Sequence, residues 1–520
     1  MVDKAERITR VKKHIFLKNA AILSVTSLIL KTVGIFFRIY LSDRIGAEGM
    51  GLYQLIVSVY VLGSTFASSG LSTATTRLIT DELVCGDPRS VRRILRRALS
   101  LSTVIAVLST LLFYLGAPLI GTYWIRDARA VPAIRVLSLS FPFMGISSCI
   151  KGYFMARRRV ASSSRAQLLE QFTRMAVIFG LFWRFSSLSL TAACAAVMVG
   201  DTVSEAISCG YISLSYLWDR RRLRREPPPH TDGCTAACGI VRRILSIAVP
   251  VTAGRYLNSL LRTAENLLVP QRLSLYTDSR EAGLSQFGTL KGMAMPLIFF
   301  PSSFLSAFST LLIPEMSEAR ALGQTRRVQR VVDHTLHITL LASLLIGGLF
   351  WLLAYPLGEL LYHSREVGFL LRVLAPLIPV MYVESVVDGI LKGLNQQVSS
   401  LKYSVADSAL RILLIVFLVP LRGMEAFLFI MILSNLFTCG LNVRRLCTVT
   451  GTHIRFGRWI LRPLGALCAG LLAASGLLRL CRTLPVLPQL MAAALLTVGC
   501  YIPLLFACGS LSRDELRLRA

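Results

Sequence analysis

Leu41-Ser-Asp-Arg-Ile-Gly-Ala-Glu-Gly-Met-Gly-Leu-Tyr-Gln54 separates two long apolar segments near the start of this 520-residue chain. Its glycine pattern returns 237 residues later, where Gly46 and Gly51 fall on Gly283 and Gly288. The same offset continues without a gap for about 130 residues and pairs Ser72 with Ser309, Gly86 with Gly323, Arg135 with Arg372, Pro142 with Pro379, Gly152 with Gly389 and Arg174 with Arg411. Chance matches between leucines are common in an apolar chain, but Gly, Pro and Arg matches at one fixed offset are not. The sequence therefore indicates an internal duplication.

The composition is that of an integral membrane protein. Hydrophobic residues make up 54% of the chain and the mean hydropathy is +0.61, which leaves too little polar surface for a water-soluble fold. A membrane-spanning helix needs about 20 mostly apolar residues. Such runs predict an all-α protein with 14 transmembrane helices, near 15–41, 51–79, 99–121, 131–156, 166–184, 188–218, 244–273, 282–314, 331–356, 368–394, 402–420, 424–443, 460–481 and 486–509.

The basic residues predict the orientation of these spans. The net charge of +29 would suggest a nucleic-acid partner in a soluble protein, but here Lys and Arg stand between apolar runs. Thirty-five Lys and Arg lie in the segment before span 1 and in the segments that follow the even-numbered spans, up to the one after span 14. The seven alternate loops hold about eight. Because positive charge gathers on the cytoplasmic side, we expect both termini in the cytoplasm and no nucleic-acid partner.

The duplication and the span count together predict an architecture of six, six and two helices. The predicted divisions are an N-terminal lobe at 1–218, a basic linker at 219–243, a C-terminal lobe at 244–447 and two additional helices at 448–520. An even number of spans in each half gives both halves the same topology, so the lobes are expected to be parallel repeats about an axis along the membrane normal.

Two further segments combine arginines with apolar residues in a helical pattern. Residues 89–98 and 326–336 match at the same offset and are expected to form amphipathic helices at the cytoplasmic interface. Their charges, with those of the linker, make anionic membrane lipids an expected partner.

Polar stripes interrupt the first and seventh spans. An ionisable group near the bilayer centre costs about 2.5 to 3.5 kcal/mol on insertion scales, so it requires a partner, a cavity or a ligand. Helical spacing places Ser27, Lys31 and Arg38 on a single face of span 1. The same spacing places Arg255, Ser259, Arg262 and Asn266 on a single face of span 7. Because like charges on one face do not pair with each other, we interpret these stripes as the lining of a cationic cavity.

Acidic residues stand near other intramembrane cations. Glu170 and Asp407 each precede an arginine by one turn, Arg174 and Arg411, and these arginines are mates in the duplication. Span 10 carries Glu384, Asp388 and Lys392 at the same four-residue spacing, and Glu265 flanks the stripe of span 7. Such pairs are either structural salt bridges or parts of a gate or an ion-coupling site, and the spacing alone leaves both open.

The sequence contains no catalytic constellation. It has no glycine-rich phosphate loop before a helix, no metal-spaced histidine pair and no Cys-x-x-Cys motif, so we expect no enzyme activity, no cofactor and no bound metal. Transport by such a chain would draw on an ion gradient, the membrane potential or the flux of the substrate.

Residues 41–54, followed by Ser68-Ser-Gly-Leu-Ser-Thr-Ala-Thr-Thr-Arg-Leu-Ile79, resemble the stage V sporulation protein B group of polysaccharide-biosynthesis proteins. This group belongs to the MOP superfamily, with MATE transporters and the MurJ lipid II flippases. The resemblance implies a pair of lobes around a central cationic cavity in the bacterial cytoplasmic membrane. Lys31, Gly34 and Arg38 fit the first-helix pattern of MurJ-like proteins, whereas Ser64 and Thr65 stand where those proteins carry a second-helix arginine. Asp407 is the lone candidate for one of their sodium ligands.

The function expected on these grounds is a flippase for a polyprenyl-pyrophosphate-linked saccharide, such as lipid II, in cell-wall or spore-cortex synthesis. An anionic diphosphate crossing hydrocarbon needs fixed cations in a water-accessible cavity, and the two stripes supply them. A cation-coupled MATE-type exporter of small cationic compounds would need a cavity rich in carboxylates. A scaffold without transport would leave the intramembrane charges unexplained.

The charge asymmetry gives a test of topology. Reporter fusions after Arg225 and Arg445 should report the cytoplasm, and fusions in the loops near Asp127 and Asp278 should report the outside. The reason is that only Arg225 and Arg445 lie in loops rich in arginine. An outside signal at Arg225 would contradict both the 14-span count and the predicted boundary between the repeats.

Overall fold

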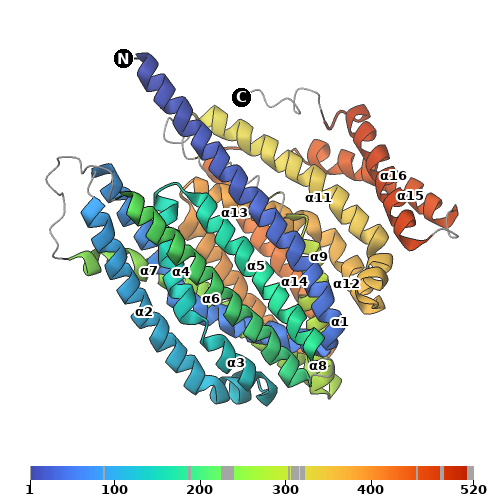
Figure 1. Cartoon of the computed structure of the whole chain (residues 1–520). Helices are drawn as coiled ribbons and strands as arrows, with labels where there is room; N and C mark the ends of the chain where they lie inside the picture. The colour runs from blue at the N-terminus through green and yellow to red at the C-terminus, as the bar shows by residue number, and fades with distance from the viewer. Residues whose placement is uncertain are drawn as a thin grey trace. The chain divides into compact units, whose positions relative to one another are not determined.

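The computed structural model describes residues 2–85, 88–185, 189–223, 239–302, 305, 316, 323–452, 455–480 and 485–511. Within these ranges every regular element is helical (Figure 1). In chain order they are α1 (Val2–Cys85), α2 (Pro88–Leu119), η1 (Ile120–Trp124), η2 (Ala128–Ala130), α3 (Val131–Ser138), α4 (Phe141–Ala156), α5 (Val160–Arg184), α6 (Leu190–Leu223), α7 (Ile240–Thr277), α8 (Arg280–Phe287), η3 (Gly288–Ala294), α9 (Met295–Phe299), α11 (Thr325–Tyr362), α12 (Arg365–Leu374), η4 (Ala375–Leu377), α13 (Ile378–Gly393), α14 (Gln397–Thr450), η5 (Gly457–Leu461), α15 (Arg462–Leu480) and α16 (Val486–Ala507). Residues 224–238 of the predicted linker, 306–314 of the predicted eighth span and 512–520 lie outside the described residues.

The helices confirm an all-helical protein that crosses a membrane several times. Among the described residues, nine helices are long and apolar enough to span a bilayer, and the number is ten if α3 and α4, bent by 44°, form one span. Helices suit this solvent because each satisfies its own backbone hydrogen bonds where no water is available.

Two of the helical elements contain a sharp break at a glycine. The 84 residues of α1 would extend about 126 Å as a straight helix, far more than the apolar thickness of a membrane, about 30 Å. The chain turns at Gly46, where φ is 67° and ψ is −176°, and α14 turns in the same way at Gly423, where φ is 58°. A side chain disfavours positive φ, so glycine at these positions allows one helix to follow another directly.

Side-chain caps begin the helices that follow two of the short loops. The Ser279 hydroxyl accepts from the backbone N–H of Ala282 at the start of α8, and Ser364 accepts from Val367 at the start of α12. Each satisfies a donor that the first turn of a helix leaves unpaired.

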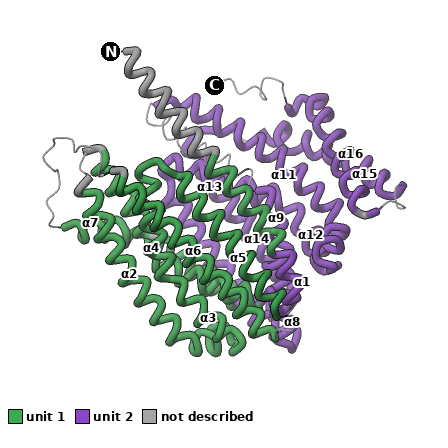
Figure 2. Tube along the Cα trace, in the orientation of Figure 1, with its two compact units in different colours: residues 1–37, 52–267 green, residues 38–51, 268–520 purple. Residues whose placement is uncertain are grey.

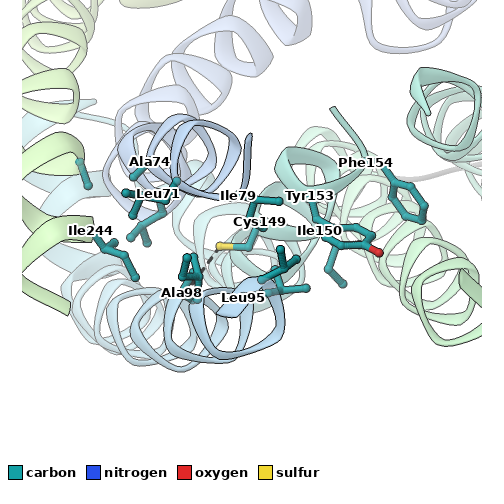
Figure 3. Packing of buried hydrophobic residues seen from close by; sticks show 14 of the residues in the cluster. Leu71, Ala74, Ile79, Leu95, Ala98, Cys149, Ile150, Tyr153, Phe154 and Ile244 are labelled. Atoms are coloured by element: carbon teal, nitrogen blue, oxygen red, sulfur yellow. Dashed lines mark hydrogen bonds between the residues drawn. The ribbon is translucent and has the colours of Figure 1, made fainter. Parts of the chain in front are cut away.

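The first compact unit contains residues 1–37 and 52–267 (Figure 2). Figure 3 shows its main core, where Leu71 and Ile79 of α1 and Leu95 of α2 meet Tyr153 of α4 and Ile244 of α7. The start of α7 thus packs into the core of unit 1, and the contacts divide the chain at Leu267, inside α7. The predicted domain boundaries, which place α7 from residue 244 onward in the second lobe, stay a prediction.

The second compact unit contains residues 38–51 and 268–520 (Figure 2). One core joins α11, α13 and α14 through residues such as Val332, Val386 and Leu446. The two last helices pack against α11, where the Tyr501 hydroxyl of α16 donates to the backbone oxygen of Leu341 at 3.1 Å.

Duplicated residues begin α2 and α11 with the same amphipathic pattern. Val91 and its mate Val328 are buried in the cores of their own units, 5% and 7% exposed. Arg93 and its mate Arg330, each two residues further along, are exposed. The predicted amphipathic character is therefore present, and contact with the lipid interface stays a prediction.

Within unit 2, two duplicated glycines form a reciprocal contact. A Cβ atom added to Gly51 would lie 2.2 Å from the carbonyl oxygen of Leu284, and one added to Gly288 would lie 2.0 Å from that of Ala47. Leu284 is the mate of Ala47 and Gly288 is the mate of Gly51 at the offset of 237 residues. Each copy of the motif thus packs on the other in the same way, as at a two-fold interface. Small residues permit this close approach of backbones.

Gly51→Ala and Gly288→Ala should each destabilise the protein by about 1–3 kcal/mol, because the added methyl group overlaps a backbone oxygen that cannot rotate away. The measurement is thermal unfolding of the purified protein in detergent. Gly440→Ala is the matched control, since nothing lies within 4 Å of its added Cβ. Equal midpoints for all three variants would show that the close contact is absent in solution.

Candidate functional site

The first predicted stripe lies on α1 before its break. Lys31 and Ser27 are exposed and Arg38 is half-buried. Lys31 precedes Gly46 by 15 residues, or about 22 Å of helix, which is less than the apolar thickness of a membrane, about 30 Å. It has no hydrogen-bond or ion-pair partner among the described residues of the protein. Arg38, which belongs to unit 2, interacts electrostatically with Tyr362.

The second predicted stripe, on α7, is divided between two environments. Arg255 and Arg262 are exposed, whereas Ser259 is buried. The Asn266 side chain donates to the Ser58 hydroxyl of α1 at 2.9 Å, so this residue holds α7 against α1. Arg255, Ser259, Arg262 and Asn266 lie on one narrow face of α7. Part of that face is exposed and part of it packs against the rest of unit 1. Helical spacing identified the face but not the neighbour that covers part of it.

The exposed arginines of α7 differ in their surroundings. Arg262 has no partner within the described parts of the chain, although Glu265, three residues away, is 3% exposed. Residues three apart on a helix can form an ion pair. Because Glu265 faces the packed side of α7 and Arg262 the open side, the two charges stay apart.

The pair predicted on span 11 is present and has a third member. The Arg411 guanidinium forms an ion pair with Asp407, and its Nε donates to the Ser434 hydroxyl at 3.0 Å. Ser434 in turn donates to Asp407 at 2.6 Å. All three residues belong to α14, on the two sides of its break at Gly423, so this network ties the two helical parts together within unit 2.

The corresponding arginine of unit 1 has two acidic partners. Arg174 on α5 forms an ion pair with Glu170 at 3.2 Å and a shorter one, at 2.6 Å, with Asp201 on α6. Lys151 on α4 reaches the other oxygen of Glu170 at 3.7 Å. Sequence reasoning missed Lys151 and Asp201. The signal for Asp201 was available, because an acidic residue within an apolar span needs an explanation of its own.

The pair predicted on span 10 lies near the C-terminal end of α13. Asp388 of α13 forms an ion pair with Lys392, as the spacing suggested, and also accepts a hydrogen bond from the Ser400 hydroxyl of α14. Glu384, one turn earlier, is half-buried. The Asp388 contacts join α13 to α14 within unit 2, and a gating role for these residues stays a prediction.

Removing the charge of Arg174 should destabilise the protein strongly, because Asp201 would then be left without its cation and Glu170 would keep only the longer contact with Lys151. Arg174→Met is expected to cost about 3 kcal/mol, measured as thermal unfolding in detergent, and adding Asp201→Asn should recover part of the loss. Arg184→Met, at an exposed position on the same helix, is the control. A strictly additive double variant would contradict the coupling between Arg174 and Asp201.

Comparison with known proteins places these features in a family. Stage V sporulation protein B of Bacillus subtilis (strain 168) is 25% identical over 388 residues, covering 74% of this chain and 74% of that protein. Lipid II flippase MurJ of the same organism is 24% identical over 415 residues, covering 73% of each. The name of the second relative describes a flippase, in agreement with the expectation that the chain is not an enzyme.

The fold agrees with this relationship. A structure described as lipid II flippase MurJ in an inward closed conformation superposes with a TM-score of 0.72 and covers 95% of this chain and 99% of its own, at 13% identity. The family model described as "Polysaccharide biosynthesis protein" matches residues 16–320, more than half of the chain. The chain, a membrane protein with a MurJ-like fold, therefore belongs to the polysaccharide biosynthesis protein family.

Proposed function

We propose that the protein is a flippase that moves a polyprenyl-pyrophosphate-linked saccharide across the bacterial cytoplasmic membrane by alternating access. The observation that carries this proposal is the presence of exposed cations without partners, Lys31 and Arg262, within long apolar helices of unit 1. A cation at membrane depth is costly unless water or an anion reaches it, and here no acidic side chain among the described residues neutralises either group.

The chemistry of the cargo fits these cations. A diphosphate carries negative charge on oxygens that accept charge-assisted hydrogen bonds from ammonium and guanidinium groups. Within unit 1, Arg255 lies on the same face of α7 as Arg262, and Ser27 lies on the same face of α1 as Lys31 and contributes a hydroxyl. Ser259 and Asn266, predicted members of the site, are engaged in packing, so we assign the main contacts to Lys31, Arg255 and Arg262. The relatives named for sporulation and for lipid II favour a cell-wall precursor as the saccharide.

The proposed architecture keeps 14 spans in lobes of six and six with two further helices, and with both termini in the cytoplasm. Dividing α1 and α14 at Gly46 and Gly423 adds two spans to the nine found, and joining α3 to α4 adds another. The 25 residues of α5, rich in charge, and the segment that begins with α8 supply the remaining two. The reciprocal contact of Gly51 with Gly288 supports a duplicated pair of lobes.

Other partners follow from this function. The amphipathic starts of α2 and α11 would rest on anionic lipids, and a coupling cation or the membrane potential would drive the cycle. An exporter of cationic compounds is disfavoured, because the exposed ionisable residues of the two stripes, Lys31, Arg255 and Arg262, are basic. A scaffold would have no use for Lys31.

The proposal is tested in liposomes that contain the purified protein and a labelled polyprenyl-pyrophosphate saccharide. The double variant Lys31→Gln, Arg262→Gln should insert normally, because losing a charge lowers the cost of burial, and should lose at least tenfold in the rate at which the headgroup reaches the opposite leaflet. Lys31→Arg should retain part of the rate, since it keeps the positive charge.

Arg184→Gln removes an exposed cation near the end of α5 and serves as the control for charge in general. It should flip at the wild-type rate. A wild-type rate in the double variant would mean that Lys31 and Arg262 do not handle the substrate, and the mechanism would have to be abandoned.

A further inference from the structure

Unit 1 contains a buried carboxylate without a partner, Glu205 in the middle of α6. Its side chain lies at 6% exposure, and it forms no hydrogen bond or ion pair with any residue that the structure describes. It is one turn beyond Asp201 on the same helix, so it faces the network around Arg174. Electrostatic interactions connect it with Glu170, Lys151, Arg174 and Asp201. An unpaired carboxylate at this depth is one of the costliest groups that a membrane protein can hold.

The charges of the network do not balance. Three carboxylates, Glu170, Asp201 and Glu205, face two cations, Lys151 and Arg174. Both cations are already engaged with Glu170 and Asp201. One negative charge is therefore in excess, and it falls on Glu205.

The remaining neighbours do not supply the missing positive charge. From α1, Tyr60 interacts electrostatically with Glu205 and Tyr53 interacts with Arg174, but both are neutral phenols. The Tyr60 hydroxyl donates to the Met144 sulfur of α4 at 2.8 Å, so it is turned to a different acceptor. Among the described residues no group of three His, Cys, Asp or Glu side chains could hold a metal ion.

Unit 2 provides an internal comparison. Arg411 contacts Ser434, whereas Arg174 contacts Asp201. The residue one turn after Ser434 is Thr438, whereas the residue one turn after Asp201 is Glu205. The Thr438 hydroxyl donates to the backbone oxygen of Ser434 at 2.9 Å. Arg411 and Asp407 thus form a balanced pair beside neutral residues, and the acidic excess is a property of unit 1 alone within the described chain.

We propose that Glu205 is a proton-exchange site that couples the proton gradient to transport. The step is an acid–base equilibrium: the carboxylate takes a proton from water on one side of the membrane, becomes a neutral carboxylic acid and returns the proton on the other side. Protonation cancels the excess charge, so the network alternates between a neutral and a singly negative state. Energy coupling rests on the proposed flippase function, whereas proton binding at Glu205 does not.

Proton binding is tested on the wild-type protein without any substrate. Dicyclohexylcarbodiimide modifies carboxylic acids that are protonated in an apolar environment, and peptide mass spectrometry locates the adduct. We expect modification of Glu205 at pH 7 and its loss as the pH rises, with Glu170 and Asp201 unmodified because their ion pairs keep them charged. An absence of label on Glu205, or label on Asp201 in its place, would overturn the assignment.

Coupling is tested in the liposome assay with an imposed gradient of one pH unit, which can bias a one-proton step by up to about tenfold. The wild type should respond to the gradient, Glu205→Asp should keep a response, and Glu205→Gln should lose it. Glu425→Gln, at an exposed carboxylate outside the network, is the control and should respond like the wild type.

Three outcomes would contradict the proposals in different ways. An equal response in Glu205→Gln and the wild type would remove Glu205 from coupling. Flipping that is insensitive to pH but responds to a sodium gradient would overturn proton coupling and leave the flippase function in place. No flipping by the wild type would overturn the flippase function, while the carbodiimide label would still decide whether Glu205 binds a proton.

Discussion

The cost of placing charge in hydrocarbon determines how the polar residues of this protein are arranged. An ion within the membrane must be paired, reached by water or bound to a ligand. Arg174 and Arg411 meet this constraint by pairing, and each fixes one helical segment against the next within its own unit. Lys31 and Arg262 have no partner among the described residues, although they lie on apolar helices. The constraint that accounts for Arg174 and Arg411 as structural residues is also the reason for proposing an anionic ligand at Lys31 and Arg262.

Because of the duplication, Arg174 and Arg411 can be compared as equivalent residues. Arg174 and Arg411 occupy mated positions, and Glu170 and Asp407 stand one turn before each. The copies have diverged on the following helical segment, where unit 1 presents carboxylates and unit 2 presents hydroxyl groups. Structural support needs only one acid for each arginine, as unit 2 demonstrates. The additional acids of unit 1 therefore exceed what stability requires, and that excess is what marks the site as more than a salt bridge.

Local spacing predicted side-chain pairs within one helix, but it did not predict contacts that depend on how a second helix packs. The pairs of Arg174 with Glu170 and of Asp388 with Lys392 follow from four-residue spacing, and the segment 41–54 between the first two predicted spans contains the break at Gly46. The partnership of Arg174 with Asp201 was not predictable, because it depends on how α5 packs against α6. Periodicity likewise placed Ser259 on the same face as the arginines of α7, but it could not show that α1 covers part of that face. The fold class was therefore accessible from composition and pattern, whereas the membership of the site required the packing.

The separation of cations from excess acid is itself a requirement of the proposed mechanism. If Glu205 lay beside Lys31 or Arg262, the opposite charges would pair, and the cation could no longer capture a diphosphate nor the carboxylate exchange a proton. Lys31 has no ion pair among the described residues, and Glu205 interacts with the Lys151 and Arg174 network instead. Lys31 and Glu205 are thus both left without an ion pair among the described residues. Because both lie in unit 1, protonation of Glu205 can act on the cation through space and through the helices that hold the two groups. Coupling between a proton and an anionic cargo needs such a connection.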